Sequence, residues 1–178
     1  MTRRTLVLGG VRSGKSLLAE TLAAEHAGRD GDAVIYVATA QARADGEMSQ
    51  RIATHRQRRP AQWTTIEAPV ALAQALREHA GEGRCLLVDC LTLWLTNLLC
   101  AGDEALLEYE REAFVHAVTA LPGRIVMVSN ETGLGVVPMG ELTRRYLDEA
   151  GALHQRVAAV CERVAFTVAG LPMWLKTT

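Results

Sequence analysis

A glycine-rich stretch near the amino terminus, GGVRSGKS, matches the pattern G-x-x-x-x-G-K-[ST]. In such loops the glycines let backbone N–H groups turn toward phosphate oxygens. The lysine brings positive charge to the β and γ phosphates, and the following hydroxyl binds Mg²⁺. An apolar run precedes the pattern and a helical run follows it, which is the context that phosphate binding requires. We therefore predict a nucleotide-binding loop made of Gly9, Gly10, Val11, Arg12, Ser13, Gly14, Lys15 and Ser16.

A loop of this kind needs a carboxylate on another strand to hold the metal ion or its waters. The apolar run CLLVD ends at Asp89, and an acid at the carboxyl end of a parallel strand faces the crevice where ligands bind. The alternative is that Asp89 caps a helix starting near Leu91. We predict Ser16 and Asp89 as the metal-binding residues. No N-K-x-D motif for guanine is present, because the only lysines are Lys15 and Lys176; these motifs leave adenine and guanine both open.

The stretch RIATHRQRRP, residues 51–60, places one histidine among four arginines. If residues 46–59 are helical, Arg51, His55 and Arg59 share one face, because positions four apart on a helix are neighbours. Guanidinium groups suit phosphate, and their charge disfavours protonation of a nearby imidazole. From these residues alone three interpretations stay open: a solvated basic face, a contact with phosphate or nucleic acid, and covalent catalysis by His55.

The elements that must position these groups alternate along the chain. Apolar runs typical of strands begin at Thr5, Ala33, Cys85 and Arg124, WTTIEA is a short strand candidate, and VAFTVAG and MWL close the chain. Continuous apolar strands alternating with helices predict an α/β domain with a mostly parallel sheet covered on both faces. We expect Gly28 to end the first helix, Pro69 to lie in the first turn of another, and a break near Gly102.

The last long helix is expected to bury one stripe of side chains, spaced by three and four residues. The stripe consists of Leu142, Tyr146, Ala150, Leu153, Val157 and Val160. Four histidines in helical text have no mutual ligand spacing, and we interpret them as surface or interface residues: His26, His79, His116 and His154.

Composition limits the class of protein. A chain of 178 residues with 49% hydrophobic and 22% charged residues predicts one domain, residues 1–178, with a real core. The net charge of −1 argues against a general nucleic-acid binder. No apolar run reaches the roughly 20 residues that span a bilayer. The cysteines lack zinc-site spacing, so we expect reduced structural thiols and a cytoplasmic protein.

Four segments occur in order along the chain: LGGVRSGKS, DGEMSQRIATHRQRRPAQWTTIEAP, LLVDCLTLWLTNLL and VSNETGLGVVP. Together they resemble the bifunctional adenosylcobinamide kinase/adenosylcobinamide-phosphate guanylyltransferase family of cobalamin biosynthesis. The resemblance covers nearly the whole chain and implies a three-layer, RecA-like P-loop fold and a homotrimer. It also implies two reactions: phosphorylation of adenosylcobinamide by GTP or ATP with Mg²⁺, and transfer of GMP from GTP to the new phosphate.

The resemblance also implies roles for single residues. His55 corresponds to the guanylylated nucleophile. Nucleotide contacts outside the glycine-rich loop are implied for Ala38, Thr39, Ala40, Arg56, Gln57, Arg58, Arg59, Glu67 and Asp89. The segment NETGLGVVP stays open between a turn at a subunit contact and a substrate or nucleotide contact through Asn130 or Glu131. Two alternative functions are a single-activity P-loop kinase for another small alcohol and a RecA-like ATPase module that acts on nucleic acid.

Overall fold

The structure is a computed structural model that describes residues 3–40 and 60–178. One seven-stranded sheet runs through it, in the order β3-β2-β4-β5-β1-β6-β7. The strands are β1 (Arg4–Gly9), β2 (Ala33–Ala38), β3 (Thr64–Glu67), β4 (Arg84–Asp89), β5 (Arg124–Asn130), β6 (Arg163–Val168) and β7 (Leu171–Thr177). Strands β1 to β6 are parallel, and β7 pairs antiparallel with β6. The predicted mostly parallel sheet is confirmed.

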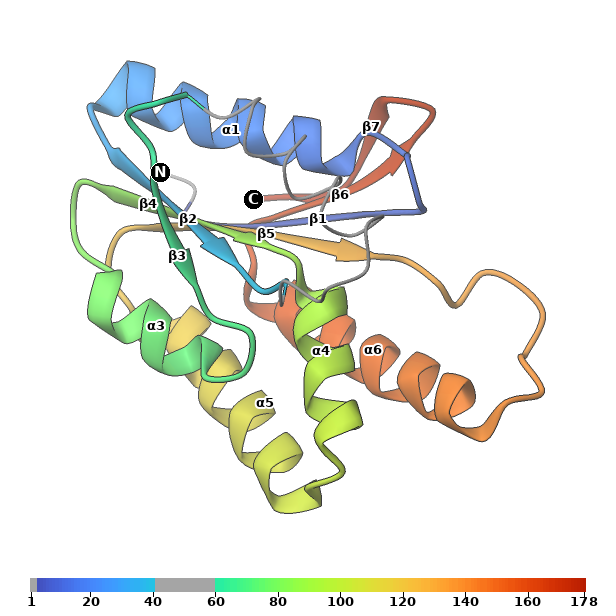
Figure 1. Ribbon diagram of the computed structural model, residues 1–178. Helices are drawn as coiled ribbons and strands as arrows, with labels where there is room; N and C mark the ends of the chain where they lie inside the picture. The colour runs from blue at the N-terminus through green and yellow to red at the C-terminus, as the bar shows by residue number, and fades with distance from the viewer. Residues whose placement is uncertain (1–2, 41–59) are drawn as a thin grey trace.

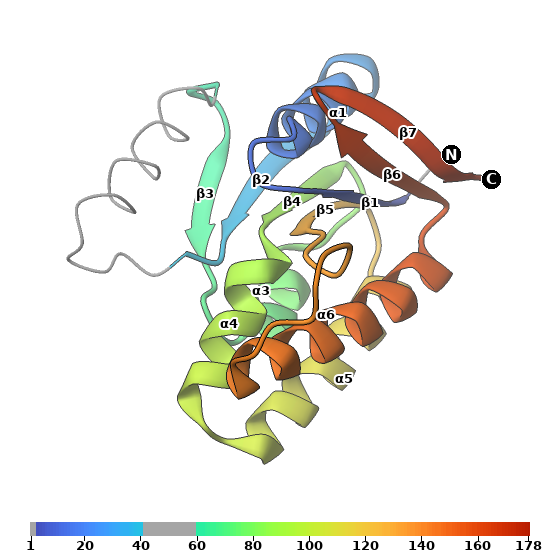
Figure 2. The same ribbon diagram turned by 90° about the vertical axis from the view of Figure 1, so that its right-hand side faces the viewer.

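Helices cover both faces of this sheet (Figure 1). They are α1 (Lys15–Asp30), α3 (Leu72–His79), α4 (Leu91–Ala101), α5 (Glu104–Ala120) and α6 (Glu141–Val160). Helix α1 lies on one face, and α3 to α6 lie on the other; the view turned by 90° shows the same three layers (Figure 2).

Each face of the sheet has its own core, and alternation along β4 shows why its sequence is apolar throughout. Leu86 and Val88 pack with α3 to α6, whereas Cys85 and Leu87 pack beneath α1. Successive side chains of a strand point to opposite faces of the sheet. When helices cover both faces, neither set of side chains faces water, and the central residues of the strand are apolar. Cys85, Cys90 and Cys161 are buried free thiols, and Cys100 is an exposed one, which confirms the expectation of unpaired cysteines.

Two expected helix boundaries are wrong. Helix α1 continues past Gly28 and ends at Gly31, whose φ of 73° is left-handed and whose N–H donates to Ala27 O at 3.1 Å. Pro69 precedes α3, which begins only at Leu72. The predicted break is confirmed, because Gly102 takes a φ of 69° and ends α4.

The apolar stripe of α6 is buried only in its second half. Ala150, Leu153 and Val157 are in the core, whereas Leu142 is 55% exposed. The first turns of α6 therefore extend beyond the sheet, together with the segment that joins them to β5 (Figure 1). Within residues 3–40 and 60–178, no helix is long and apolar enough to cross a membrane.

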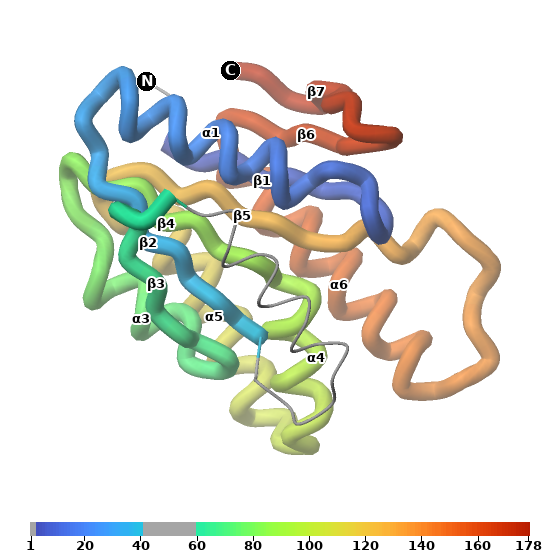
Figure 3. Tube along the Cα trace, turned by 45° about the horizontal axis from the view of Figure 1, so that its top comes forward, coloured from blue at the N-terminus to red at the C-terminus, as the bar shows by residue number. Residues whose placement is uncertain are grey.

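The parallel strands give the sheet two unlike edges. We call the edge where β1 to β6 end the carboxyl edge, and the edge where they begin the amino edge. The turn from β1 into α1 lies at the carboxyl edge, with the β6–β7 turn beside it (Figure 3). Ligands of open parallel sheets bind at the carboxyl edge.

Candidate active site

The glycine-rich loop connects β1 to α1 at the carboxyl edge. Gly14 takes a φ of 95° at the N-cap of α1, and Arg12 also lies in the left-handed region with a φ of 56°. The loop is held from outside by the β6–β7 turn, where the N–H of Gly170 donates to Ser13 O at 2.9 Å. The predicted strand–loop–helix context of residues 9–16 is confirmed.

Two glycines of this loop have no room for a side chain. A Cβ on Gly9 would lie 2.4 Å from Ser13 Oγ and 2.7 Å from Thr167 O. A Cβ on Gly14 would lie 3.0 Å from the Cα of Gly170, in addition to the strain of its positive φ. The tight turn that these glycines permit is what lets the backbone approach a ligand closely.

The same turn contains polar atoms without a protein partner. Ser13 Oγ and Thr167 Oγ1 are buried, and neither has a hydrogen-bond partner among the described residues. The N-cap of α1 has no side-chain hydrogen bond, so the first N–H groups of the helix keep their capacity for an anion. Buried polar groups are normally satisfied, and a bound phosphate would supply the missing acceptors.

Lys15 folds back over the loop, and its Nζ donates to Gly10 O at 3.0 Å. Burial lowers the pKa of its ammonium, while Cys90 and Asp89 act in the opposite direction. Cys90 stays protonated at neutral pH, because burial raises the pKa of its thiol to about 11. Lys15 is thus a half-buried cation near the carboxylate of Asp89, suited to attract phosphate.

Asp89 ends β4 and does not serve as the N-cap of α4, a position occupied by Cys90. Its Oδ2 accepts a hydrogen bond from the hydroxyl of Tyr36 at 2.7 Å. Tyr36 is 2% exposed. Because its side chain is held in the core, its hydroxyl keeps the Asp89 carboxylate in a fixed orientation. The capping interpretation of Asp89 is therefore wrong.

The oxygen atoms of Ser16 and Asp89 are hard donors of the type that Mg²⁺ prefers. Among the described residues, no group of three or more His, Cys, Asp or Glu side chains could hold a metal ion alone. A Mg²⁺ ion typically keeps waters and binds phosphate oxygens besides one or two protein ligands. The donors at this edge fit that pattern.

The other predicted nucleotide positions lie further along the edge. Ala38 is in register with Asp89 on one side and with Glu67 on the other. Glu67 belongs to the outermost strand β3, four strands from β1, which is about 19 Å at the usual strand spacing. The structure therefore brings Lys15 and Asp89 together, but leaves Glu67 at the far end of the same edge.

Thr39 is fully buried and occupied by internal contacts. Its Oγ1 donates to Cys90 O at 2.7 Å and accepts from Cys90 N at 2.8 Å. The side-chain amide of Asn97 donates to Thr39 O at 3.0 Å and to Pro69 O at 2.9 Å. The predicted residues His55, Arg56, Gln57, Arg58 and Arg59 lie outside the described residues.

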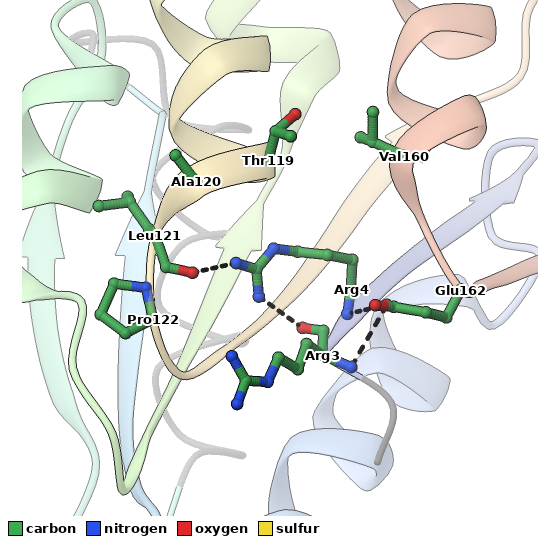
Figure 4. Close-up of a pocket in the computed structure, with 8 residues that line it drawn as sticks. All are labelled: Arg3, Arg4, Thr119, Ala120, Leu121, Pro122, Val160 and Glu162. Carbon is green, nitrogen blue, oxygen red and sulfur yellow. Dashed lines mark hydrogen bonds between the residues drawn. The ribbon is translucent and has the colours of Figure 1, made fainter.

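A hollow of about 260 Å³ at the amino edge is unrelated to this chemistry (Figure 4). The guanidinium of Arg4, one of the residues that line the hollow, donates to Val118 O, to Leu121 O and, at 2.8 Å, to Gly123 O. Glu162 accepts the backbone N–H of Arg4 at 2.6 Å. The Arg4 guanidinium and the Glu162 carboxylate both bind backbone groups, so the hollow has a structural role.

Comparison with protein families decides the identity of the chain. Residues 5–175 match the model of the family described as cobinamide kinase/cobinamide phosphate guanyltransferase. The chain belongs to this family. It is an enzyme of cobalamin biosynthesis with kinase and guanylyltransferase activities.

Curated relatives extend over the full length of this family member. It is 67% identical to the bifunctional adenosylcobalamin biosynthesis protein CobP of Pseudomonas aeruginosa over 173 residues, 97% of each chain. It is 36% identical over 184 residues to the bifunctional adenosylcobalamin biosynthesis protein CobU of Escherichia coli, covering 96% of this chain and 98% of that protein.

Solved structures of remote sequence share the fold. A flagellar accessory protein FlaH from Methanocaldococcus jannaschii superimposes with a TM-score of 0.56 at 14% identity, covering 99% of this chain and 79% of FlaH. A KaiC-like protein from Pyrococcus horikoshii gives a TM-score of 0.52 at 12% identity, covering 92% of this chain and 70% of that chain. The predicted three-layer, RecA-like P-loop fold is confirmed.

Two histidines that the sequence predicted at the surface or an interface are buried, His154 toward the carboxyl edge and His26 at the amino edge. His154 is 7% exposed and His26 is 9% exposed, so the interpretation of both as surface residues is wrong. His154 is four positions after Ala150 and three before Val157, which places it on the buried face of α6. This spacing is the sequence signal from which the burial of His154 could have been predicted.

Proposed function

We propose that residues 9–16 hold GTP or ATP with Mg²⁺ for phosphorylation of the aminopropanol hydroxyl of adenosylcobinamide. The observation that carries this assignment is the cradle at the carboxyl edge. It joins a glycine turn without space for side chains, buried hydroxyls that have no hydrogen-bond partner among the described residues, and a half-buried lysine near Asp89. Such a cradle suits an anion of several phosphates and has little use in a structural turn.

In the kinase step, the substrate hydroxyl oxygen forms a bond to the γ-phosphorus, and the bond from that phosphorus to the bridging oxygen breaks. The electron pair of this bond leaves on the nucleoside diphosphate. Lys15 and the N-terminal N–H groups of α1 stabilise the charge that develops on the phosphate oxygens. Ser16 and Asp89 would hold Mg²⁺, which neutralises phosphate charge when bound.

In the second reaction, we propose that the imidazole of His55 attacks the α-phosphorus of GTP. A P–N bond forms and pyrophosphate leaves with the electron pair of the broken P–O bond. The phosphate of the substrate then displaces the histidine and gives adenosylcobinamide-GDP. The arginines around His55, Arg56, Arg58 and Arg59, would bind the anionic groups and keep the imidazole neutral.

Labelling with α-³²P GTP tests this assignment. The wild-type protein should form a covalent GMP adduct that is lost in mild acid, as phosphoramidates are. His55→Ala should abolish the adduct and guanylyl transfer but keep the kinase step, whereas His116→Ala, at an exposed position on α5, should keep both.

An adduct that persists in His55→Ala would assign the nucleophile to another residue. Absence of an adduct in the wild type would contradict the covalent histidine–GMP step and favour direct transfer of GMP to the substrate phosphate. Salt-sensitive DNA binding, which reports phosphate neutralisation, would contradict our further proposal that the enzyme has no nucleic-acid partner.

We also propose that the enzyme works as a homotrimer in the cytoplasm. Several large apolar side chains near the carboxyl edge are exposed in the single chain, and contact between copies would cover them. They are Leu134, Val136, Val137, Met139, Leu171 and Met173. Light scattering should give three times the chain mass of 19.3 kDa, and a monomer or dimer would contradict the trimer.

A further inference from the structure

The end of β5 occupies a central place at the carboxyl edge. Strand β5 lies between β1, which carries the glycine-rich loop, and β4, which carries Asp89. Immediately after β5, the backbone N–H of Glu131 donates to Gly9 O at 3.0 Å. Glu131 is therefore joined directly to the first glycine of the proposed phosphate cradle.

The carboxylate of Glu131 is held from two sides. Its Oε1 accepts the N–H of Gly133 at 2.7 Å. Its Oε2 lies 3.6 Å from Nδ1 of His154, and the Glu131 side chain remains 22% exposed. A carboxylate has about four lone-pair sites, so these contacts leave capacity for a substrate hydroxyl.

Behind Glu131, His154 belongs to a chain of hydrogen bonds. Its Nε2 lies 2.8 Å from Ser129 Oγ, and Ser129 Oγ lies 3.4 Å from Thr92 Oγ1. Thr92 Oγ1 accepts the N–H of Asn130 at 2.7 Å. The tautomer that fits both contacts carries its proton on Nδ1, facing Glu131 Oε2 at 3.6 Å, and accepts the hydroxyl proton of Ser129 at Nε2.

Space for an acceptor exists beside this carboxylate. A hollow of about 380 Å³ is lined by Gly133, Val137, Arg144, Leu147 and Asp148. Gly133 is the residue whose N–H binds Glu131.

We propose that Glu131 accepts the proton of the substrate hydroxyl in the kinase step, and that His154 is the positioning residue that orients its carboxylate. The O–H bond of the alcohol breaks toward a Glu131 oxygen as the alcohol oxygen bonds to the γ-phosphorus, and the bond to the leaving diphosphate breaks. His154 keeps both its protonation state and its bond to Ser129. The proposal rests on the assignment of residues 9–16 to the triphosphate.

Burial shifts the pKa values of several groups around this pair. Tyr146 of α6 is buried beside it, and burial raises the pKa of its hydroxyl. Cys90, at the start of α4, has a pKa of about 11 because it is buried. Burial also lowers the pKa of His154, although Glu131 opposes this shift. A change in the rate profile that His154→Gln causes and His26→Gln does not would therefore report the contact between Glu131 and His154.

The chain contains a matched control for His154. His26 is also buried, and its Nδ1 lies 3.7 Å from Asp30 Oδ2. This second pair lies at the amino edge, near the end of α1. Removing either imidazole disturbs a buried histidine–carboxylate contact, but only one of them supports a group at the carboxyl edge.

The test is the single-turnover rate of adenosylcobinamide phosphorylation at saturating Mg²⁺ and nucleotide, followed against pH. Glu131→Gln should lower this rate about 10²-fold, the usual loss for a general base, without changing nucleotide affinity or the labelled GMP adduct. His154→Gln should lower it less and change the acid limb, because it removes the imidazole that contacts the Glu131 carboxylate. His26→Gln should keep the wild-type rate and limb.

A Glu131→Gln rate within threefold of wild type, or an unchanged acid limb in His154→Gln, would overturn the proposal. Should Glu131→Gln not fold, Glu131→Asp decides: it keeps a base and must retain more activity than Glu131→Ala. If instead residues 9–16 do not hold the triphosphate, the result differs, because Lys15→Ala would then leave nucleotide-dependent phosphorylation intact.

Discussion

At the amino edge of the sheet, cationic side chains bind the carbonyl ends of helices, whereas at the carboxyl edge the N-termini of α1 and α4 have no side-chain cap among the described residues. Arg4 donates to carbonyls at the end of α5, Arg84 to His79 O of α3 at 3.0 Å, and Lys176 to Ala158 O of α6 at 3.1 Å. Cations at helix C-termini stabilise the helix dipole. At the amino edge these three cations thus bind the protein's own carbonyl groups.

The carboxyl edge has the opposite character. The N-caps of α1 and α4, Gly14 and Cys90, make no side-chain cap hydrogen bond. Ser13 Oγ and Thr167 Oγ1, also at this edge, lack partners among residues 3–40 and 60–178. The same helix dipoles that serve stability at one edge are therefore available to an anionic ligand at the other. Substitutions at the carboxyl edge should therefore impair catalysis, whereas substitutions at the amino edge should impair folding.

The largest effect is expected for Lys15→Ala. Loss of its positioned charge should lower the phosphorylation rate about 10²- to 10³-fold, as for removal of other donors that stabilise transition states. Lys176→Ala is the control, since it removes the only other lysine, which lies at the amino edge. Equal activity of the two variants would contradict the assignment of the catalytic site to the carboxyl edge.

Asp89→Asn should raise the Mg²⁺ concentration required for half-maximal activity by at least about tenfold, because a neutral amide holds the ion poorly. Tyr36→Phe should cause a smaller shift in the same direction, since it removes the hydroxyl that orients Asp89. Magnesium titrations with thermal melts measure both. A fall in melting temperature with an unchanged Mg²⁺ requirement would make Asp89 a structural residue.

At the amino edge, Arg4→Met should weaken folding and spare the chemistry. The carbonyls of Val118, Leu121 and Gly123 would lose their donor, at a cost on the order of 2–4 kcal/mol in the free energy of unfolding. Urea unfolding measures this loss, and kcat below the melting range should match wild type. A selective loss of kcat would show that the edges are coupled.

The smallest effect concerns pH. Burial, helped by Arg124, lowers the pKa of His26, so folding favours its neutral form. This contribution is fully present above the ordinary histidine pKa of about 6.5 and is lost as pH falls through that value toward the lowered one. His26→Gln should therefore flatten the fall of the melting temperature between neutral and mildly acidic pH. An identical slope in both proteins would exclude His26 as a contributor.

The sequence predicted the parts of the molecule that depend on local pattern. The loop at residues 9–16, the buried strand ending at Asp89 and the break at Gly102 follow from residue type and spacing. Gly28 shows the limit, because a glycine tolerated within a helix looks the same in sequence as one that ends it. The position that takes a left-handed φ is Gly31.

Contacts between distant residues were not predictable in the same way. Tyr36 and Asp89 are 53 positions apart, and His154 and Ser129 are 25 apart. Only the order of strands and the packing of α6 bring them together. The position of His154 on the buried face of α6 could be predicted from its spacing, but the residues that contact its imidazole could not. The role of His55 rests on family resemblance, since it lies outside the described residues.

The most direct test of the account is hydrogen exchange in the wild-type enzyme with and without Mg²⁺ and a non-hydrolysable GTP analogue. Amides of residues 9–16 should exchange more slowly with the nucleotide, because their N–H groups bind phosphate, and residues 119–124 at the amino edge should be unchanged. Slower exchange at residues 119–124, or none at residues 9–16, would contradict the claim that the carboxyl edge holds the nucleotide.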